Sequence, residues 1–595
     1  MQPIDTRIKP LDVLPLTKYR SVIYDPYIEL PIFAPFTMHC EIIMYGYYLP
    51  DRYYMDQLNL YGLFDKYVPN ANGSELEPAQ VLCMMVLNMV NAGKPLYRVE
   101  EWLENYLDGV TEERIKANKY NDDRLARTLD KLFKADRGSL MAEVSKRAMD
   151  VHALEVERVH NDTTSITFAG AYETPSAGAV EPKLGFNKDH RPDCKQIVFG
   201  LNITEDGHVP LSFQLYDGNQ ADVDTHRPNW DGLRKLLEKE DFIYVADSKL
   251  CALESLSHIA KRGGLFITVM PRNFKEVSQF LERVRAGEDI EWHHTHKQPN
   301  TRNKKEHITY SIHEGESTRD GYRLLWVHSS SKAAQQEKAR ESRLEKAEQK
   351  LADMADKLNA YHLKTREQIE KQVEKIQAGC SGLIRVDILE QKQTERVKLG
   401  RGRPGANSRY EQRESTHYQL QWHRDEAAIA QARRTDGLFP LVDNTELSPV
   451  EVLCTYKKQP YLEKRFHTTK SVLEVAPVFL KTPRRIEAMV FLYFIALMLV
   501  SLIERTIRGQ MHKENIVSLP IRPSGLSTKA PTWENLQHFF RNVHLAMVVQ
   551  GRRILTTSVK GIRSLHAHLL QLLKVPLSVY EQLKDGWWSF AVHSG

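Results

Sequence analysis

The spacing of apolar residues changes its period near residue 155, and the segment that follows constrains the fold most. Before this point the spacing is helical, and after it come three alternating segments followed by two strand–helix pairs. We expect strands at 156–168, 195–203, 208–216, 242–247 and 265–270, and helices at 224–239 and 252–262. Three meandering strands followed by βα units predict an α/β fold with a mixed five-stranded sheet and helices on its faces.

The flanking segments predict further domains. Residues 1–51 are an extension rich in Pro and Tyr, and residues 52–150 have helical periodicity throughout. The helical segment 52–150 is compatible with two functions, either binding a nucleic-acid end or packing and dimerisation. No helix within it carries a distinctive basic face, so both interpretations stay open.

The pattern of the sheet domain breaks after residue 275, and residues 276–440 have the character of an insertion. This segment combines short alternating stretches with a long charged helix, in which Leu344, Leu351 and Leu358 recur every seven residues. The compact pattern returns over 441–510 as a second part of the sheet domain, and 511–595 is expected to be helical.

One apolar run, residues 488–503, requires comparison with a membrane span. It is 16 residues long, whereas a spanning helix needs about 20. Glu487 and Glu504 bracket it directly. These features favour a buried core helix over a membrane span.

Composition excludes several classes of protein. The 595 residues hold 82 Lys and Arg against 77 Asp and Glu, so the net charge of +5 excludes a histone-like polycation. It does not exclude a nucleic-acid partner, because a modest global charge can conceal local basic patches. The six cysteines contain no C-x-x-C pair, which argues against a zinc ribbon or a disulfide framework and fits a reducing cytosol.

Two acidic residues stand where sheet proteins place functional groups. Asp162 lies within the first expected strand, in VHNDTTS, and Asp247 ends the buried strand FIYVAD. Loops at strand ends commonly carry sites. Asp247 could equally cap the following helix, so both interpretations remain open on these grounds.

A third acid belongs to a polar stripe near residue 460. Tyr456, Gln459, Glu463 and Lys470 are separated by 3, 7 and 14 residues from the first, which puts them within about 60° on a helical wheel. Pro460 should kink or restart the helix, which weakens the assignment of Tyr456. A solvated helix face would give the same spacing.

These residues, together with longer blocks, resemble the DDE transposases of bacterial insertion sequences, and more narrowly the superfamily with the Y-R-E-K signature. The resemblance runs from about 52 to 580. The blocks are NDTTS at 161–165, GFNKDHRPDCKQ at 185–196, GNQAD at 218–222, ADSKL at 246–250, GRGRPG at 400–405, and ELSPVEVL with the segment from EKRFHTTK onwards after 446.

The resemblance implies a fold and a chemistry. The fold is an RNase H-like catalytic core in two parts, 151–275 and 441–510, interrupted by the insertion at 276–440. Asp162, Asp247 and Glu463 would be the catalytic and metal-binding triad. Because three close carboxylates repel one another unless cations neutralise them, two Mg²⁺ or Mn²⁺ ions are implied. The sequence contains no Gly-rich P-loop, so ATP is not required.

The resemblance also implies partners. Tyr456 and Lys470 match signature positions that contact DNA near the transposon end, whereas Gln459 stands where the family has Arg. Arg401 and Arg403, in an Arg-Gly-Arg-Pro segment similar to the core of an AT-hook, are further candidates for DNA contact.

The expected partners are double-stranded DNA, both terminal inverted repeats and target, and a second copy of the chain. No membrane is involved, and the expected location is the bacterial cytosol at the nucleoid. The expected function is metal-dependent cleavage of transposon ends and strand transfer. A nuclease on the same fold without end specificity, or an inactive transposase-derived DNA-binding protein, are the alternatives.

Overall fold

The chain forms two compact units, which we describe separately. The computed structural model describes residues 38–581, apart from 45–47, 71–72, 75, 92, 108–116, 169, 171, 173–174, 189–190, 301–305, 361, 400–409, 473–479, 481 and 551–552. Unit 1 comprises residues 1–153, 167–182 and 467–595, and unit 2 comprises residues 154–166 and 183–466.

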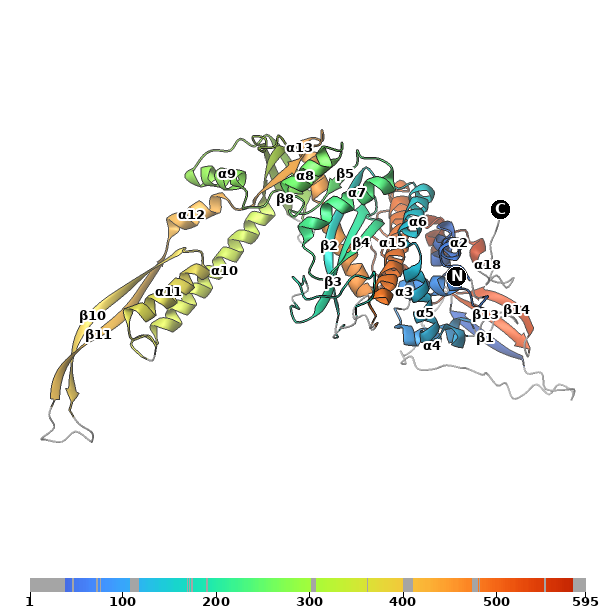
Figure 1. The fold of residues 1–595 in the computed structure, drawn as a ribbon, viewed down its shortest axis with the longest axis horizontal. Coiled ribbons are helices and arrows are strands. Elements are labelled where there is room, and N and C mark those ends of the chain that lie inside the picture. Colours follow the sequence, from blue (N-terminus) through green and yellow to red (C-terminus); the bar gives the residue numbers. More distant parts are fainter. Residues whose placement is uncertain are drawn as a thin grey trace, which may run out of the picture. The chain divides into compact units, whose positions relative to one another are not determined.

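A nine-stranded mixed sheet forms the centre of unit 2 (Figure 1). Its strand order is β4-β3-β2-β5-β6-β12-β9-β8-β7. In chain order the strands are β2 Arg158–Phe168, β3 Lys195–Thr204, β4 Pro210–Tyr216, β5 Ile243–Val245, β6 Leu265–Val269, β7 His294–Pro299, β8 His307–Glu314, β9 Arg323–Ser329 and β12 Leu438–Asp443. The first five strands are those that the sequence pattern predicts.

The prediction of a five-stranded sheet was wrong in its extent. β12 pairs antiparallel with β6 on one side and with β9 on the other, and β8 and β7 follow. These four strands come from the segment 276–440 and the start of 441–510, so much of the expected insertion extends the same sheet. An exposed edge at β6 would leave backbone groups unpaired, and β12 covers it.

Strands β2, β5 and β6 are neighbours in the sheet and run parallel to one another. Because they run in the same direction, their carboxyl ends lie at the same edge of the sheet. Between them run two helices, α7 His226–Leu237 after β4 and α8 Leu253–Ala260 after β5. Ile243, Val245 and Ile267 share a buried core with Val452 and Leu453 of α13 Pro449–Tyr456. α13 begins at a capping box, in which the Ser448 backbone N–H donates to the Glu451 carboxylate at 2.9 Å.

The kink or restart of the helix expected at Pro460 is confirmed. α13 ends at Tyr456, and α14 Pro460–His467 begins at the proline, which has no N–H to continue the preceding helix. A short π-helix, Thr468–Val472, follows. Tyr456 and Glu463 therefore belong to different helices rather than to one polar stripe.

The remainder of the expected insertion contains a helical pair beside a long β-hairpin. Helices α10 Ser330–Ala355 and α11 Arg366–Gly379 lie alongside the two-stranded sheet of β10 Ile384–Lys398 and β11 Tyr410–Arg424 (Figure 1). Leu344 and Leu351 are buried in the core between them, as their spacing predicts, whereas Leu358 lies past the end of α10. Two further helices complete unit 2, α9 Lys275–Ala286 and α12 Glu426–Arg434.

Helices form most of unit 1. Its N-terminal part contains α1 Tyr48–Gln57, α2 Leu60–Tyr67, α3 Pro78–Asn91, α4 Val99–Leu107, α5 Asp122–Lys134 and α6 Arg137–His152. These agree with the helical pattern expected for 52–150. α15 Pro483–Lys513 contacts α3 and α5. It is the one helix in the described part of the chain that is long and apolar enough to cross a membrane, and its most apolar 18-residue window is completely buried within the protein.

The prediction that 511–595 is entirely helical was wrong. α16 Trp533–Phe540, α17 Ser564–Leu572 and α18 Ser578–Glu581 flank two strands, β13 His544–Gln550 and β14 Arg553–Lys560. These strands form an antiparallel three-stranded sheet with β1 Met38–Met44. Short apolar runs do not distinguish a strand from a helix by periodicity, and residues 543–549 were of this kind.

Candidate active site

Asp162 lies on β2, and Asp247 lies two residues past the end of the neighbouring parallel strand β5. The register of β2 and β5 pairs His160 with Val245, and each aspartate lies two residues beyond its member of that pair. Matched positions on parallel strands share one edge and one face of the sheet. The strand pairing thus brings together two carboxyl groups that are 85 residues apart in sequence.

Two further side chains, Lys188 and Asp222, join this pair. The Lys188 ammonium lies 3.5 Å from Asp162 Oδ1 and 3.9 Å from Asp222 Oδ2. It also donates to the carbonyl and the hydroxyl oxygens of Thr163, at 2.6 and 3.0 Å. The Thr163 hydroxyl donates in turn to Asp222 Oδ1 at 2.9 Å. One ammonium group therefore partly neutralises a cluster of acidic side chains.

Electrostatics confirm that the two aspartates and Tyr456 are near one another. Burial raises the pKa of Asp162 to about 6, Lys188 opposes that rise, and the charge of Asp247 adds to it. Burial also raises the pKa of Asp247, against the backbone N–H of Lys249 and the ammonium of Lys188. Burial and the charges of Asp247 and Asp162 raise the pKa of Tyr456 to about 12. Carboxyl groups with raised pKa values at one sheet edge are typical of functional sites.

Gln459, a candidate for DNA contact, uses both of its polar side-chain atoms inside unit 2. Its Nε2 donates to the carbonyl oxygen of Asn161 at 2.7 Å, and its Oε1 lies 3.0 Å from His160 Nδ1. These contacts hold the strand that carries Asp162. Next to it in sequence, the Lys458 ammonium lies 2.6 Å from a carboxylate oxygen of Glu205.

Glu463 lies on α14 and is exposed. α14 is attached to the turn between β3 and β4, because the Arg465 guanidinium donates to the carbonyl oxygens of His208 and Gly207, both at 2.9 Å. The Tyr461 ring stacks on His208 with 3.9 Å between centroids. In the part of the chain that the structure describes, no three His, Cys, Asp or Glu side chains are grouped closely enough to hold a metal ion.

The structure therefore gathers Asp162, Asp247 and Tyr456 and does not bring Glu463 into the same group. Lys470 lies on the π-helix and belongs to unit 1. Arg401 and Arg403 lie outside the described residues.

The sequence argument missed Lys188 and Asp222 as members of the site. Each lies in a block that carries the resemblance, Lys188 in GFNKDHRPDCKQ and Asp222 at the end of GNQAD. Those blocks could have identified them. Their convergence on Asp162 depends on loops that no local periodicity predicts.

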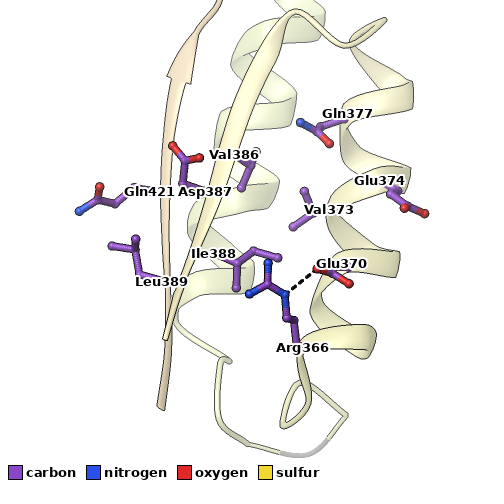
Figure 2. Close-up of a pocket in the computed structure, with 10 residues that line it drawn as sticks. All are labelled: Arg366, Glu370, Val373, Glu374, Gln377, Val386, Asp387, Ile388, Leu389 and Gln421. Atoms are coloured by element: carbon purple, nitrogen blue, oxygen red, sulfur yellow. Dashed lines mark hydrogen bonds and ion pairs between the residues drawn. The ribbon is translucent and has the colours of Figure 1, made fainter. Parts of the chain in front are cut away.

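A cavity of about 520 Å³ lies elsewhere in unit 2, between α11 and β10 (Figure 2). Val373, Val386 and Ile388 form its apolar part, and Arg366 lies at one end with a 2.8 Å ion pair to Glu370. None of the site residues expected from the sequence lines it. The carboxylate cluster on β2 and β5 is therefore the stronger candidate for chemistry.

Comparison with known proteins shows the family of the chain. The Transposase DDE domain family matches residues 190–499, which is more than half of the chain and includes Asp247 and Glu463, and a domain of unknown function (DUF4277) matches residues 52–146. No curated protein matches the sequence. A solved structure titled as the piggyBac transposase synaptic complex with hairpin DNA is 7% identical, covers 93% of this chain and 88% of its own, and has a TM-score of 0.34, too low to support an argument. From the family match over residues 190–499, the chain belongs to the DDE transposase family.

Proposed function

We propose that this transposase cleaves DNA at the ends of a mobile element and joins the freed ends to target DNA. The observation that supports this most directly is the Asp162–Asp247 pair at the shared edge of β2 and β5. The strand order β4-β3-β2-β5-β6 around that pair supports an RNase H-like catalytic core, with residues 330–424 as the inserted segment.

The donor set fits a hard divalent cation. Asp162 and Asp247 offer carboxylate oxygens, the ligands that Mg²⁺ and Mn²⁺ prefer, and burial, with the charge of a neighbouring aspartate, raises the pKa of each. Asp162 and Asp247 would hold the metal, with Glu463 as the proposed third ligand. When bound, two such ions supply a more acidic water and stabilise the leaving oxygen of a phosphodiester.

Helical geometry supports Glu463 as that third ligand. Gln459 and Glu463 are four residues apart across the start of α14, and residues at this spacing lie on one helix face. The Gln459 side chain reaches Asn161, the neighbour of Asp162. Glu463 follows Gln459 by about one turn and lies at an exposed position in the first turn of α14.

The proposed reaction hydrolyses one phosphodiester and then exchanges another, and neither step needs ATP. In the first step a water oxygen bonds to phosphorus, the bond from phosphorus to the 3′ oxygen breaks, and that oxygen takes a proton. In the second step the freed 3′-hydroxyl attacks a phosphodiester of the target, and a target 3′-hydroxyl leaves. Lys188, beside Asp162, would pair with a phosphate oxygen of the bound strand.

The proposed partners are the double-stranded terminal inverted repeats, the target DNA and a second copy of the chain. Because such ends come in pairs, two active sites must act on one element. Tyr456 and Lys470 are proposed to contact the end near the cut, and Arg401 and Arg403 to contact the duplex. The location proposed with these partners is the bacterial cytosol, at the nucleoid.

The test is cleavage of the element's own terminal repeats by the purified full-length chain with Mg²⁺. We expect Asp247→Asn to reduce cleavage at least 100-fold, since a lost ligand removes several kcal/mol of stabilisation, and each factor of ten is about 1.4 kcal/mol. Asp241→Asn is the matched control, because Asp241 is exposed and stands just before the opposite end of β5.

Three results would contradict the proposal. Unchanged cleavage by Asp247→Asn would remove this aspartate from the site. Equal cleavage of scrambled duplexes would indicate a nuclease without end specificity. Binding of the repeats without any cutting would indicate a DNA-binding protein derived from a transposase.

A further inference from the structure

An unusually exposed aromatic side chain lies in the loop whose Lys188 reaches the carboxylate cluster. Phe186 lies in the loop before β3, two residues from Lys188, and its side chain is 89% exposed. We propose that the Phe186 ring stacks on an unpaired nucleobase at the cut end of the DNA. This inference rests on the proposed function and assigns a binding role to a residue outside the Asp162, Asp247 and Glu463 set.

Hydrogen bonds tie the backbone at Lys183 and Phe186 to neighbouring segments. Lys183 and Gln196 exchange two backbone hydrogen bonds, at 2.9 and 3.1 Å. The Gln196 side chain is buried, and its Nε2 donates to the carbonyl oxygens of Phe186 at 3.0 Å and of Gly218 at 2.8 Å. The hydrogen bond that the Phe186 carbonyl oxygen accepts from Gln196 holds the Phe186 backbone in place, while the ring points away from the protein.

Gly185 shows how closely the loop approaches the segment behind it. A Cβ at this position would lie 2.2 Å from the carbonyl oxygen of Gly218, closer than any real contact. Only glycine allows this approach. At the far end, Lys188 attaches the loop to Thr163 and lies 3.5 Å from Asp162. The backbone that carries the ring is thus held beside the catalytic strand.

A nucleobase is the occupant that this placement favours. Any phosphodiester that reaches Asp162 and Asp247 passes near Lys188, so nucleic acid comes close to the loop that carries Phe186. Inside a duplex both faces of a base are stacked, but an unpaired or displaced base offers a face to a ring. Stacking on an aromatic side chain tolerates any base, which suits a position at the cut.

The experiment uses photo-cross-linking and affinity, both measured without cleavage. Duplexes of the terminal repeat carry 5-iododeoxyuridine at single positions around the cut, and the full-length chain is irradiated with them in EDTA. We expect cross-linking at one position, mapped to Phe186 by mass spectrometry. Phe186→Ala and Phe186→Leu should lose the cross-link and bind this DNA about 5- to 150-fold more weakly. Phe186→Trp should retain binding.

Leu253→Ala is the control, since Leu253 is another exposed apolar residue of unit 2 and is not in this loop. The inference is overturned if the wild-type chain cuts the repeats while Phe186→Ala binds them as well as the wild type. It is also overturned if Phe186→Ala changes the oligomeric mass but not the DNA affinity, which would assign the ring to a protein contact. A chain that cross-links through Phe186 but never cuts would contradict the proposed catalysis and leave the stacking inference intact.

Discussion

At the scale of single residues, the burial of Asp162 has a measurable consequence for stability. Its pKa is raised from 3.8 to about 6 in the folded chain, so folding favours the protonated form. An acid with a raised pKa stabilises the fold fully at pH values below its unfolded pKa, and that stabilisation is lost as the pH rises through 6.

Asp162→Asn removes the ionisation, so it should stabilise the metal-free protein at pH 8. A shift of about two pKa units corresponds to a gain of up to about 3 kcal/mol. The gain should shrink below pH 6 and vanish below pH 4. Chemical denaturation in EDTA at several pH values measures it. Equal gains at pH 8 and pH 4 would contradict the role of ionisation.

Divalent metal should cancel most of the stability difference between the two proteins. Mg²⁺ at about 100 times its dissociation constant stabilises the wild-type chain by about 2.7 kcal/mol, because it binds the folded state alone. Asp162→Asn has lost a carboxylate, so its melting temperature should respond much less. Asp241→Asn, with both aspartates of the pair intact, should respond as the wild type does. An equal response of Asp162→Asn would place the metal elsewhere.

Gln459 gives a second prediction at this scale, because its side chain has partners within unit 2. Gln459→Ala would leave the carbonyl oxygen of Asn161 without this donor and should lower the free energy of unfolding by about 1–3 kcal/mol. Gln421→Ala, at an exposed position on β11, is the control and should change little. Gln459→Arg restores the family signature, yet we expect no tighter DNA binding from it. Tighter DNA binding with an unchanged free energy of unfolding would show that the side chain at position 459 contacts DNA rather than Asn161.

At the scale of elements, the position of α14 decides where Glu463 lies. Arg465 connects this helix to two carbonyl oxygens with a planar fork that lysine lacks. Arg465→Lys should therefore destabilise unit 2 by about 1.5–3 kcal/mol. It should also slow DNA cleavage, because it changes the position of α14 and not because residue 465 contacts DNA. Hydrogen exchange of α14 together with a cleavage rate measures both effects. Full activity with a released α14 would argue against Glu463 as a ligand.

The central strands could be predicted from the sequence, because the apolar runs and end residues that define them are adjacent in the chain. Strands such as β5 and β6 are short apolar runs between helices with clear ends at Asp247 and Gly263. The extension of the sheet by β12 could not be predicted, because pairing between residues 441 and 269 depends on contacts far apart in sequence. Asp162 and Asp247 were found from strand ends, whereas Lys188 reaches the site through a loop.

α15 provides a prediction about unit 1. Leu497 is completely buried in this helix, so Leu497→Asp puts an unpaired charge in an apolar core. We expect a loss above about 4 kcal/mol and unfolding of unit 1, seen by circular dichroism and size-exclusion chromatography. Val517→Asp, at a position 70% exposed, should stay within about 0.5 kcal/mol of the wild type. A folded Leu497→Asp variant would contradict the assignment of α15 as a core helix.

At the scale of the whole molecule, the chain passes between its two units several times. Residues 154–166 belong to unit 2 and residues 167–182 to unit 1, so strand β2 carries Asp162 close to a point where the chain changes units. Six consecutive segments were expected from sequence, and two interleaved units were found. Composition and periodicity describe neighbours along the chain, so they could not predict that residues 467–595 fold with residues 1–153.

The net charge of +5 leads to a prediction about how the whole chain binds duplex DNA. A chain so close to neutral binds duplex DNA through local cationic groups, and each neutralised phosphate adds about 0.9 to the slope of log K against log salt. Replacing Arg401 and Arg403 by alanine should therefore weaken binding to all duplexes and reduce that slope by about 2. Fluorescence anisotropy at several salt concentrations measures it, with Arg319 and Arg343, both exposed, replaced as the control. An unchanged slope would show that the Arg-Gly-Arg-Pro segment does not contact phosphate, because counterion release counts every phosphate that the protein neutralises.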